Sequence, residues 1–220
     1  MKTVMFDKKI HTYAGHNPYI VPFVPPDSFV LDVGCGTGEL GRRLQNGKHC
    51  RVYGIDISPQ ALVRAREHLY RTAVVDIEAD TPQLPDQKFD VIILGDVIEH
   101  LRFPEPALKR LLQLLKTNGL VIVSIPNVAN ILIRLKLLAG KWQYTQSGIM
   151  DETHIRFYTF QSMLKLFENL GLQIKEFTSI PGRYFIKKSK RQNPTRLERL
   201  LSRWWPALFA TQFVFKLEQR

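Results

Sequence analysis

Short apolar runs alternate along the chain with segments in which apolar residues recur at helical spacing. The strand-like runs lie at 28–33, 51–57, 72–76, 89–94 and 120–125. Helical patterns follow at 39–45, 58–69 and 106–116, where Ser58 and Pro59 supply an N-cap and a first-turn proline. This alternation is typical of a parallel sheet covered by helices on both faces. We therefore predict an α/β, doubly wound, Rossmann-like fold.

The regular pattern stops after position 126 and returns near position 160. We predict a helix at 160–170, capped by Thr159 and ended by Gly171, then a strand at 172–179. A helix at 195–203 and a last strand at 211–217 follow. A length of 220 residues with 45% hydrophobic content suits one well-filled core. We predict a single domain, 1–220, with an insertion or lid at 127–158 and a basic, aromatic insertion at 183–210.

The insertion opens with an apolar helical segment at 127–140 that carries few cations. Buried amphipathic helices outnumber interfacial ones, so we expect this segment to pack on the sheet as an ordinary cap. The alternative is a lid that closes over the acceptor and touches a lipid-linked substrate.

Positive charge is concentrated at the end of the chain. Residues 183–220 hold ten Lys or Arg against two acids, which gives +8 of the formal net charge of +11. Arg196, Arg199 and Arg203 fall on one helical stripe ahead of Trp204 and Trp205. An anionic partner is implied, and peripheral membrane contact through this basic region is one reading. Only two cysteines occur and no apolar run has the length of a membrane span, so we predict a cytoplasmic protein.

The candidate ligand site is the run VLDVGCGTGEL at positions 30–40, where a strand enters a glycine loop ahead of a helix. Such a loop lets a ligand approach the backbone closely beside a helix N-terminus. Its G-x-G-x-G spacing and Asp32 disfavour a dinucleotide pyrophosphate. Asp56 is placed to accept hydrogen bonds from a ribose diol, and Asp76 can reach an adenine amino group. Three acids at successive strand ends favour a ligand that carries positive charge.

The glycine loop, together with YGIDI at 53–57, FDVIILGD at 89–96 and NGLVIVSI at 118–125, resembles the class I S-adenosylmethionine-dependent methyltransferases. The resemblance covers roughly residues 28–179. It implies a seven-stranded, mostly parallel sheet with an antiparallel last strand, and S-adenosyl-L-methionine as cofactor. The cofactor contacts that it implies are Asp32, Gly34, Gly36, Gly38, Asp56, Ile57, Asp76 and Ile77.

The candidate acceptor site follows the fourth predicted strand. Asp96, Glu99 and His100 share one face of a helical turn at i, i+3 and i+4 spacing, and His154 comes after the insertion. This set resembles the metal site of small-RNA 2′-O-methyltransferases and the Glu-His pair of ubiquinone-type O-methyltransferases. It implies a divalent cation such as Mg²⁺ on Asp96, Glu99, His100 and His154. Without metal, we expect His100 or His154 as general base, with Asp96 as a further catalytic residue and Asp151 and Arg156 as secondary candidates.

The leading hypothesis is O-methylation of a sugar or polyol hydroxyl in glycan or envelope biosynthesis, on a small-molecule or lipid-linked glycan acceptor. The segment at 126–159 also resembles bacterial methyltransferases associated with surface polysaccharides. One alternative is an RNA ribose 2′-O-methyltransferase, although no second nucleic-acid module is visible. The other is a non-catalytic, cofactor-binding partner subunit. The sequence does not indicate an oligomeric state.

Overall fold

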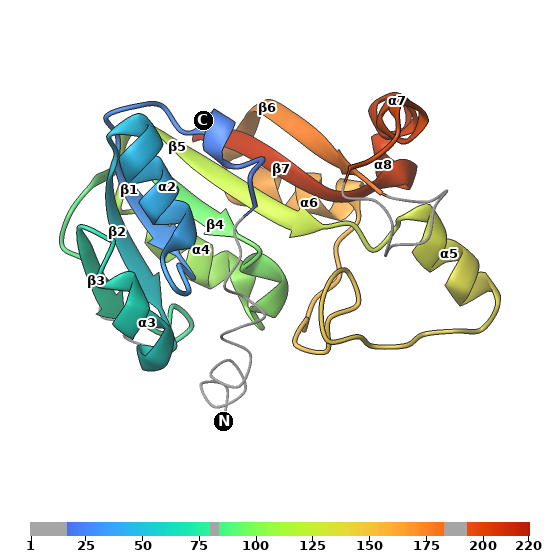
Figure 1. Cartoon of the computed structure of the whole chain (residues 1–220), viewed down its shortest axis with the longest axis horizontal. Coiled ribbons are helices and arrows are strands. Elements are labelled where there is room, and N and C mark those ends of the chain that lie inside the picture. The colour runs from blue at the N-terminus through green and yellow to red at the C-terminus, as the bar shows by residue number, and fades with distance from the viewer. Residues whose placement is uncertain (1–16, 80–83, 183–192) are drawn as a thin grey trace.

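A computed structural model describes residues 17–79, 84–182 and 193–220. Within them, seven strands form one sheet in the order β3-β2-β1-β4-β5-β7-β6 (Figure 1). The strands are β1 (Phe29–Val33), β2 (Arg51–Asp56), β3 (Arg71–Val74), β4 (Phe89–Gly95), β5 (Leu115–Pro126), β6 (Leu172–Pro181) and β7 (Ala210–Gln219). The pairs among β1 to β5 are parallel, whereas β7 runs antiparallel to both β5 and β6. The predicted fold class is confirmed.

Helices cover both faces of the sheet. Helices α2 (Glu39–Lys48) and α3 (Pro59–Ala65) lie over one face, and α4 (Pro104–Leu112) and α6 (Phe160–Asn169) over the other (Figure 1). Strand residues alternate between the two cores: Val30 packs with α2 and α3, whereas Leu31 packs with α4 and α6. The short 3-10 helices are η1 (Val21–Phe23) and η2 (Ile98–His100).

Several helix starts follow from their capping residues, as predicted. The Ser58 side chain accepts a hydrogen bond from the Ala61 amide, and Thr159 forms a capping box with Ser162 at α6. The end of α4 was predicted too late, because Leu115 and Lys116 belong to β5. Leu115 pairs with Phe89, and Lys116 forms an ion pair with Asp90, so strand pairing overrides the helical pattern there.

Helices α5 (Ile131–Leu138), α7 (Arg196–Trp204) and α8 (Pro206–Phe209) lie at one end of the molecule (Figure 1). The expectation that α5 packs on the sheet is wrong, because none of its residues is buried. Positions 187–191, which hold four of the ten Lys and Arg residues counted in 183–220, lie outside the described residues. No helix in the described part of the chain is long and apolar enough to cross a membrane.

Candidate active site

A cavity of about 570 Å³ opens at the carboxyl ends of β1, β2 and β4. This is the point at which the strand order reverses between β1 and β4, where open α/β sheets bind their ligands. The volume lies in the range of small-molecule and cofactor sites. Seven of the eight predicted cofactor residues line it, namely Asp32, Gly34, Gly36, Asp56, Ile57, Asp76 and Ile77.

The glycine loop continues the pairing of β1 with β2 into the cavity wall. The amides of Gly34 and Cys35 both donate to the carbonyl of Ile55, at 2.8 and 3.1 Å. Gly34 has a φ of +68°, and a Cβ there would lie 2.7 Å from Cγ2 of Val97. Both the left-handed backbone and the close approach therefore require glycine at this position.

Gly38 has a different role from the predicted one. It does not line the cavity but caps α2 with a φ of +83°. A Cβ at Gly38 would contact Ala65 of α3 and Leu69 at 3.1–3.2 Å. The third glycine of the motif thus allows α2 and α3 to pack closely, and it supports the loop without touching the ligand space.

Asp56 ties the glycine loop to the end of β2. Its Oδ2 accepts from the Gly36 amide and its Oδ1 from the Ser58 amide, each at 2.8 Å. A carboxylate has about four acceptor positions, so this residue can hold the loop and still accept from a ligand diol. Asp76 accepts from the Glu78 amide at 2.9 Å and faces the same cavity.

The cavity lining is strongly acidic. Among the described residues it contains Asp32, Asp56, Asp76, Glu78 and Asp96 but neither Lys nor Arg. Asp32 is buried, and its Oδ2 has no hydrogen-bond partner within the described chain. Burial, and secondly the charge of Asp56, raises the pKa of Asp32 to about 7. Such a lining fits a cationic ligand and would repel a pyrophosphate.

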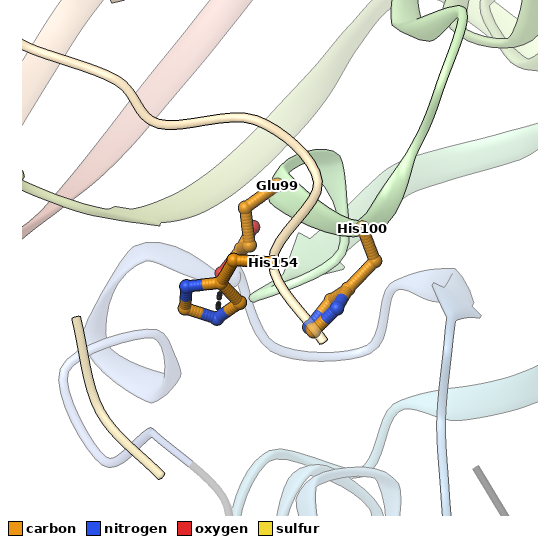
Figure 2. Close-up of side chains that lie close together, drawn as sticks. All are labelled: Glu99, His100 and His154. Carbon is orange, nitrogen blue, oxygen red and sulfur yellow. Dashed lines mark ion pairs between the residues drawn. The ribbon is translucent and has the colours of Figure 1, made fainter. Parts of the chain in front are cut away.

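A cluster of Glu99, His100 and His154 adjoins the cavity, and Figure 2 shows the two imidazoles and the carboxylate facing one another. The ligand atoms of the three residues lie within 4.8 Å of one another. His100 also lines the cavity, and its ring centroid is 4.9 Å from that of His154. Nε2 of His154 lies 4.0 Å from Oε1 of Glu99.

Backbone carbonyls orient both imidazole rings. Nδ1 of His100 lies 3.1 Å from the Thr153 carbonyl, and Nδ1 of His154 lies 3.0 Å from the Ile149 carbonyl. A carbonyl can only accept, so each Nδ1 is the donor in these contacts, and in a neutral ring the lone pair is then on Nε2. The rings are therefore set to accept a proton or bind a metal through Nε2.

The loop that carries His154 is fastened to η2 through the backbone. The amides of Ile155 and Arg156 donate to the Glu99 carbonyl at 2.9 and 3.0 Å. Asp151, a secondary base candidate, is buried and accepts from the amide and hydroxyl of Thr153. The Arg156 guanidinium donates to the Arg102 carbonyl. Neither Asp151 nor Arg156 belongs to the histidine cluster; their contacts shape the loop.

Glu99 is 1% exposed, and neither carboxylate oxygen has a hydrogen-bond partner in the described chain. Burial raises its pKa well above the usual value, and the charges of Asp96 and Asp151 add to this effect. An unpaired carboxylate charge is costly when it is buried. Glu99 therefore either carries a proton itself or has an imidazolium or a metal cation beside it.

The sequence suggested that Asp96 shares a helical face with Glu99 and His100, but in the structure it does not. It adopts a left-handed backbone, φ +58°, ahead of η2, and its Oδ1 accepts from the Ser124 hydroxyl at 2.7 Å and from the Gln212 amide. Its side chain is open at the rim of the cavity, yet neighbouring protein atoms desolvate the carboxyl group and raise its pKa to about 6. It is therefore separate from the three-residue cluster.

Ser124 and Gln212, which had no role predicted from the sequence, also belong to this edge of the site. They lie on β5 and β7, and the antiparallel pairing of these strands brings them to the same edge of the cavity. Ser124 lies in an apolar strand pattern and Gln212 follows Thr211 at the start of the last predicted strand, so neither position offers a local signal for its role.

The doubly wound sheet, the glycine loop and the acidic cavity define a class I nucleoside-cofactor fold of the methyltransferase type. A methyltransferase-domain family model matches residues 11–176, and the chain belongs to this family. Membership implies S-adenosylmethionine as the cofactor.

Several curated relatives are named as ubiquinone biosynthesis O-methyltransferases. The ubiquinone biosynthesis O-methyltransferase of an Azoarcus species is 36% identical over 153 residues, covering 66% of this chain and 64% of that protein. The Aeromonas salmonicida protein of the same name is 28% identical over 160 residues, covering 69% and 65%. The chain spans 44–65% of the length of the first relatives compared.

Solved structures share the fold. An S-adenosylmethionine-dependent methyltransferase from Archaeoglobus fulgidus superposes with a TM-score of 0.63 at 16% identity, covering 99% of this chain and 94% of that one. A methyltransferase from Clostridium acetobutylicum gives a TM-score of 0.61 at 16% identity, covering 99% and 98%. At these identities the likeness concerns the fold alone.

Proposed function

We propose that the chain transfers a methyl group from S-adenosylmethionine to a hydroxyl oxygen. The observation that carries this proposal is the cavity lined by five acids and, among the described residues, no Lys or Arg, in a chain whose net charge is +11. S-adenosylmethionine supplies an electrophilic methyl group on a positively charged sulfur, and it also carries an ammonium group. A site built for a phosphate ligand would have the opposite charge.

Each acid of the cavity has a separate task in this proposal. Asp56 accepts from the ribose hydroxyls while it holds the glycine loop, and Asp76 accepts from the adenine amino group. Asp32 offers a buried oxygen to the cationic part of the ligand. A nearby positive charge stabilises the ionised form of Asp32 and lowers its pKa.

The histidine pair removes the proton from the acceptor. As the acceptor oxygen bonds to the methyl carbon, the methyl–sulfur bond breaks and its electron pair passes to sulfur. Nε2 of His100, which lines the cavity, or of His154 takes the hydroxyl proton. Glu99 beside His154 stabilises the resulting imidazolium. The main task of the protein is to hold oxygen, methyl and sulfur in line.

The same three side chains fit a divalent cation. Glu99 contributes an oxygen, and both imidazoles present Nε2 with Nδ1 held by a carbonyl, the usual outer contact of a metal-bound histidine. A cation held there would lower the pKa of the acceptor hydroxyl. The carboxylate of Asp96, the fourth predicted ligand, accepts hydrogen bonds from Ser124 and Gln212 and is not grouped with these three residues.

The acceptor determines how much help the base needs. A phenol has a pKa of about 10, which a histidine base can approach, whereas an alcohol resembles water, at about 15.7, and needs the cation more. The names of the relatives favour a hydroxyl group of a ubiquinone precursor. The sugar or polyol hydroxyl inferred from the sequence stays a second acceptor class, and an RNA ribose a third.

The test is a transfer assay with methyl-labelled S-adenosylmethionine over phenolic acceptors, glycan precursors and RNA, with and without a chelator. We expect label in a hydroxyl-bearing acceptor and a fall of about 100-fold or more for His100→Ala with His154→Ala. The matched control is His68→Ala, because His68 is exposed between α3 and β3 and does not line the cavity.

The outcomes separate the alternatives. Activity that collapses with chelator and returns with Mg²⁺ supports the cation, and activity unchanged by chelation leaves histidine alone as the base. Full activity in the double histidine variant would overturn the proposed acceptor site. A folded chain that binds the cofactor but labels none of these acceptors would favour the non-catalytic partner subunit.

A further inference from the structure

Helix α7 exposes its apolar side and buries a polar one. Leu197, Leu200 and Trp204, at i, i+3 and i+7, are 52%, 63% and 77% exposed. The residues turned toward the protein are Glu198 and Ser202, which are 2% and 1% exposed. Surface helices of globular proteins normally show the reverse arrangement.

Specific polar contacts fix this orientation. Glu198 closes a capping box, since its carboxylate accepts from the Thr195 amide at 2.6 Å and its own amide donates to the Thr195 hydroxyl at 2.9 Å. The Ser202 hydroxyl donates to the Ser179 hydroxyl of β6 at 3.0 Å. The apolar stripe of α7 is thus held toward solvent by the rest of the molecule.

Helix α5 presents a second exposed apolar side at the same edge. Its Leu135, Leu137 and Leu138 are 53%, 55% and 86% exposed. The side-chain amides of Asn127 and Asn130 at its base donate to the carbonyls of Ala207 and Ala210, in and just after α8. These bonds attach the start of α5 to the segment that follows α7, and Figure 1 shows both helices at one end of the molecule.

The two helices and their flanks form what we call the α5–α7 surface. It consists of Leu132, Leu135, Leu137, Leu138, Trp142, Leu197, Leu200, Trp204 and Trp205, all exposed. It contains every tryptophan of the chain, since the sequence holds three. Tryptophan is enriched where one side of a ring meets hydrocarbon and the other meets water.

The charges on this surface are of one sign. Positions 131–142 contain Arg134, Lys136 and Lys141 and no acid. Helix α7 carries Arg196, Arg199 and Arg203, and its one acid is the buried Glu198. Exposed leucines and tryptophans bordered only by cations are what an anionic lipid interface binds. A second copy of the chain would bring the same positive charges against these.

We propose that the α5–α7 surface docks on an anionic lipid bilayer, with its leucines and tryptophans in the interfacial layer and its cations at the headgroups. The docking follows from the surface alone. One consequence rests on the proposed function: Ile180 and Gln212, which line the cavity, stand at the end of β6 and the start of β7 that bracket α7 and α8. Docking therefore brings the cavity edge near the bilayer, where an amphiphilic acceptor resides.

Vesicle binding by the full chain tests the docking. Tryptophan emission should shift to shorter wavelength, and the protein should cosediment, with vesicles containing about 30% phosphatidylglycerol. Neutral phosphatidylcholine vesicles should bind at least tenfold less, and raising salt from about 0.1 to 0.5 M should release the protein.

Two variants probe the two helices. Leu197→Gln with Leu200→Gln, and Leu135→Gln with Leu138→Gln, should each weaken vesicle binding about tenfold or more. The matched control is Val63→Gln with Phe103→Gln, which changes side chains that are 60% and 67% exposed elsewhere. For charge, Arg196, Arg199 and Arg203 are changed to Gln and compared with the same change at Arg43, Arg64 and Arg66.

The result against docking is a folded protein that binds S-adenosylmethionine but shows neither emission shift nor cosedimentation with anionic vesicles at low salt. Equal losses in the variants and their controls would also overturn it. Self-association that disappears in the α5 and α7 variants, without lipid binding, would assign the surface to a second copy. Because cofactor binding is measured separately, failure of docking and failure of the proposed function are distinguishable.

Discussion

The cavity and the α5–α7 surface have opposite electrostatic character in one small chain. The cavity gathers five acids on a protein of net charge +11, whereas the α5–α7 surface combines exposed leucines with cations. Overall charge therefore describes the outer surface and says little about the ligand. The cavity is matched to a cation, and the surface to an anionic partner.

The largest expected effect comes from removing Asp56, whose carboxylate binds the glycine loop and, in the proposed function, the ribose of the cofactor. Asp56→Ala deprives the Gly36 and Ser58 amides of their acceptor and the ribose diol of its partner. We expect the Kd for S-adenosylmethionine to rise by about 100-fold or more, measured by calorimetry. Glu218→Gln, which removes an acid that pairs with Lys175 on the outer sheet edge, is the control and should leave the Kd unchanged.

A smaller effect is expected from a change that alters the shape of the glycine loop and leaves the charge of the cavity unchanged. Gly34 and Gly171 have nearly equal φ values, +68° and +67°, but a Cβ meets Val97 at the first and open space at the second. Gly34→Ala should therefore lower the free energy of unfolding by about 1–3 kcal/mol more than Gly171→Ala. Denaturant titration measures both, and equal losses would show that the close approach to Val97 is unimportant.

The pH dependence of cofactor binding tests the charge of Asp32. The pKa of this residue is about 7 without ligand, and the cationic ligand favours the ionised form. Binding therefore releases a proton at pH 6, and the Kd should fall about tenfold as the pH rises from 6 to 8. In Asp32→Asn this dependence should be lost. A Kd that rises with pH in the wild type would contradict the assignment.

The smallest expected effect is on cofactor binding when the charges of the α5–α7 surface are changed. Changing Arg196, Arg199 and Arg203 to Gln removes three cations from α7 but none from the cavity lining. We expect the Kd for S-adenosylmethionine to change by less than about twofold, because solvent screens charges at this range. A larger change would show that the surface and the cavity are coupled.

The fold was largely predictable because its signals are local. Alternating apolar runs, the Ser58 and Thr159 caps and the glycine loop each act within a few residues. The end of α4 was not predictable from local signals, because Leu115 belongs to β5, where it pairs with Phe89. The exposure of α5 was not predictable either. Its apolar sequence predicts burial, and nothing local shows that the sheet is already covered.

The residues of the site also divide into those that local sequence signals could place and those that they could not. Asp32, Asp56 and Asp76 lie at or just beyond the carboxyl ends of β1, β2 and β3, so the sequence could place them at one sheet edge. Glu99, His100 and His154 meet as the resemblance implied, although whether they bind a cation stays a prediction. Asp96 was misplaced because its left-handed backbone turns it toward Ser124 and Gln212, a contact made only by the pairing of β5 with β7.

The central claim is that the cavity selects a cationic nucleoside. Calorimetric titration of the folded chain with S-adenosylmethionine, neutral S-adenosylhomocysteine, ATP and NAD tests it directly. We expect binding of S-adenosylmethionine in the micromolar range and no binding of ATP or NAD, because the acids of the cavity repel their phosphates. Tighter binding of ATP or NAD, or no binding of S-adenosylmethionine at sub-millimolar concentration, would contradict it.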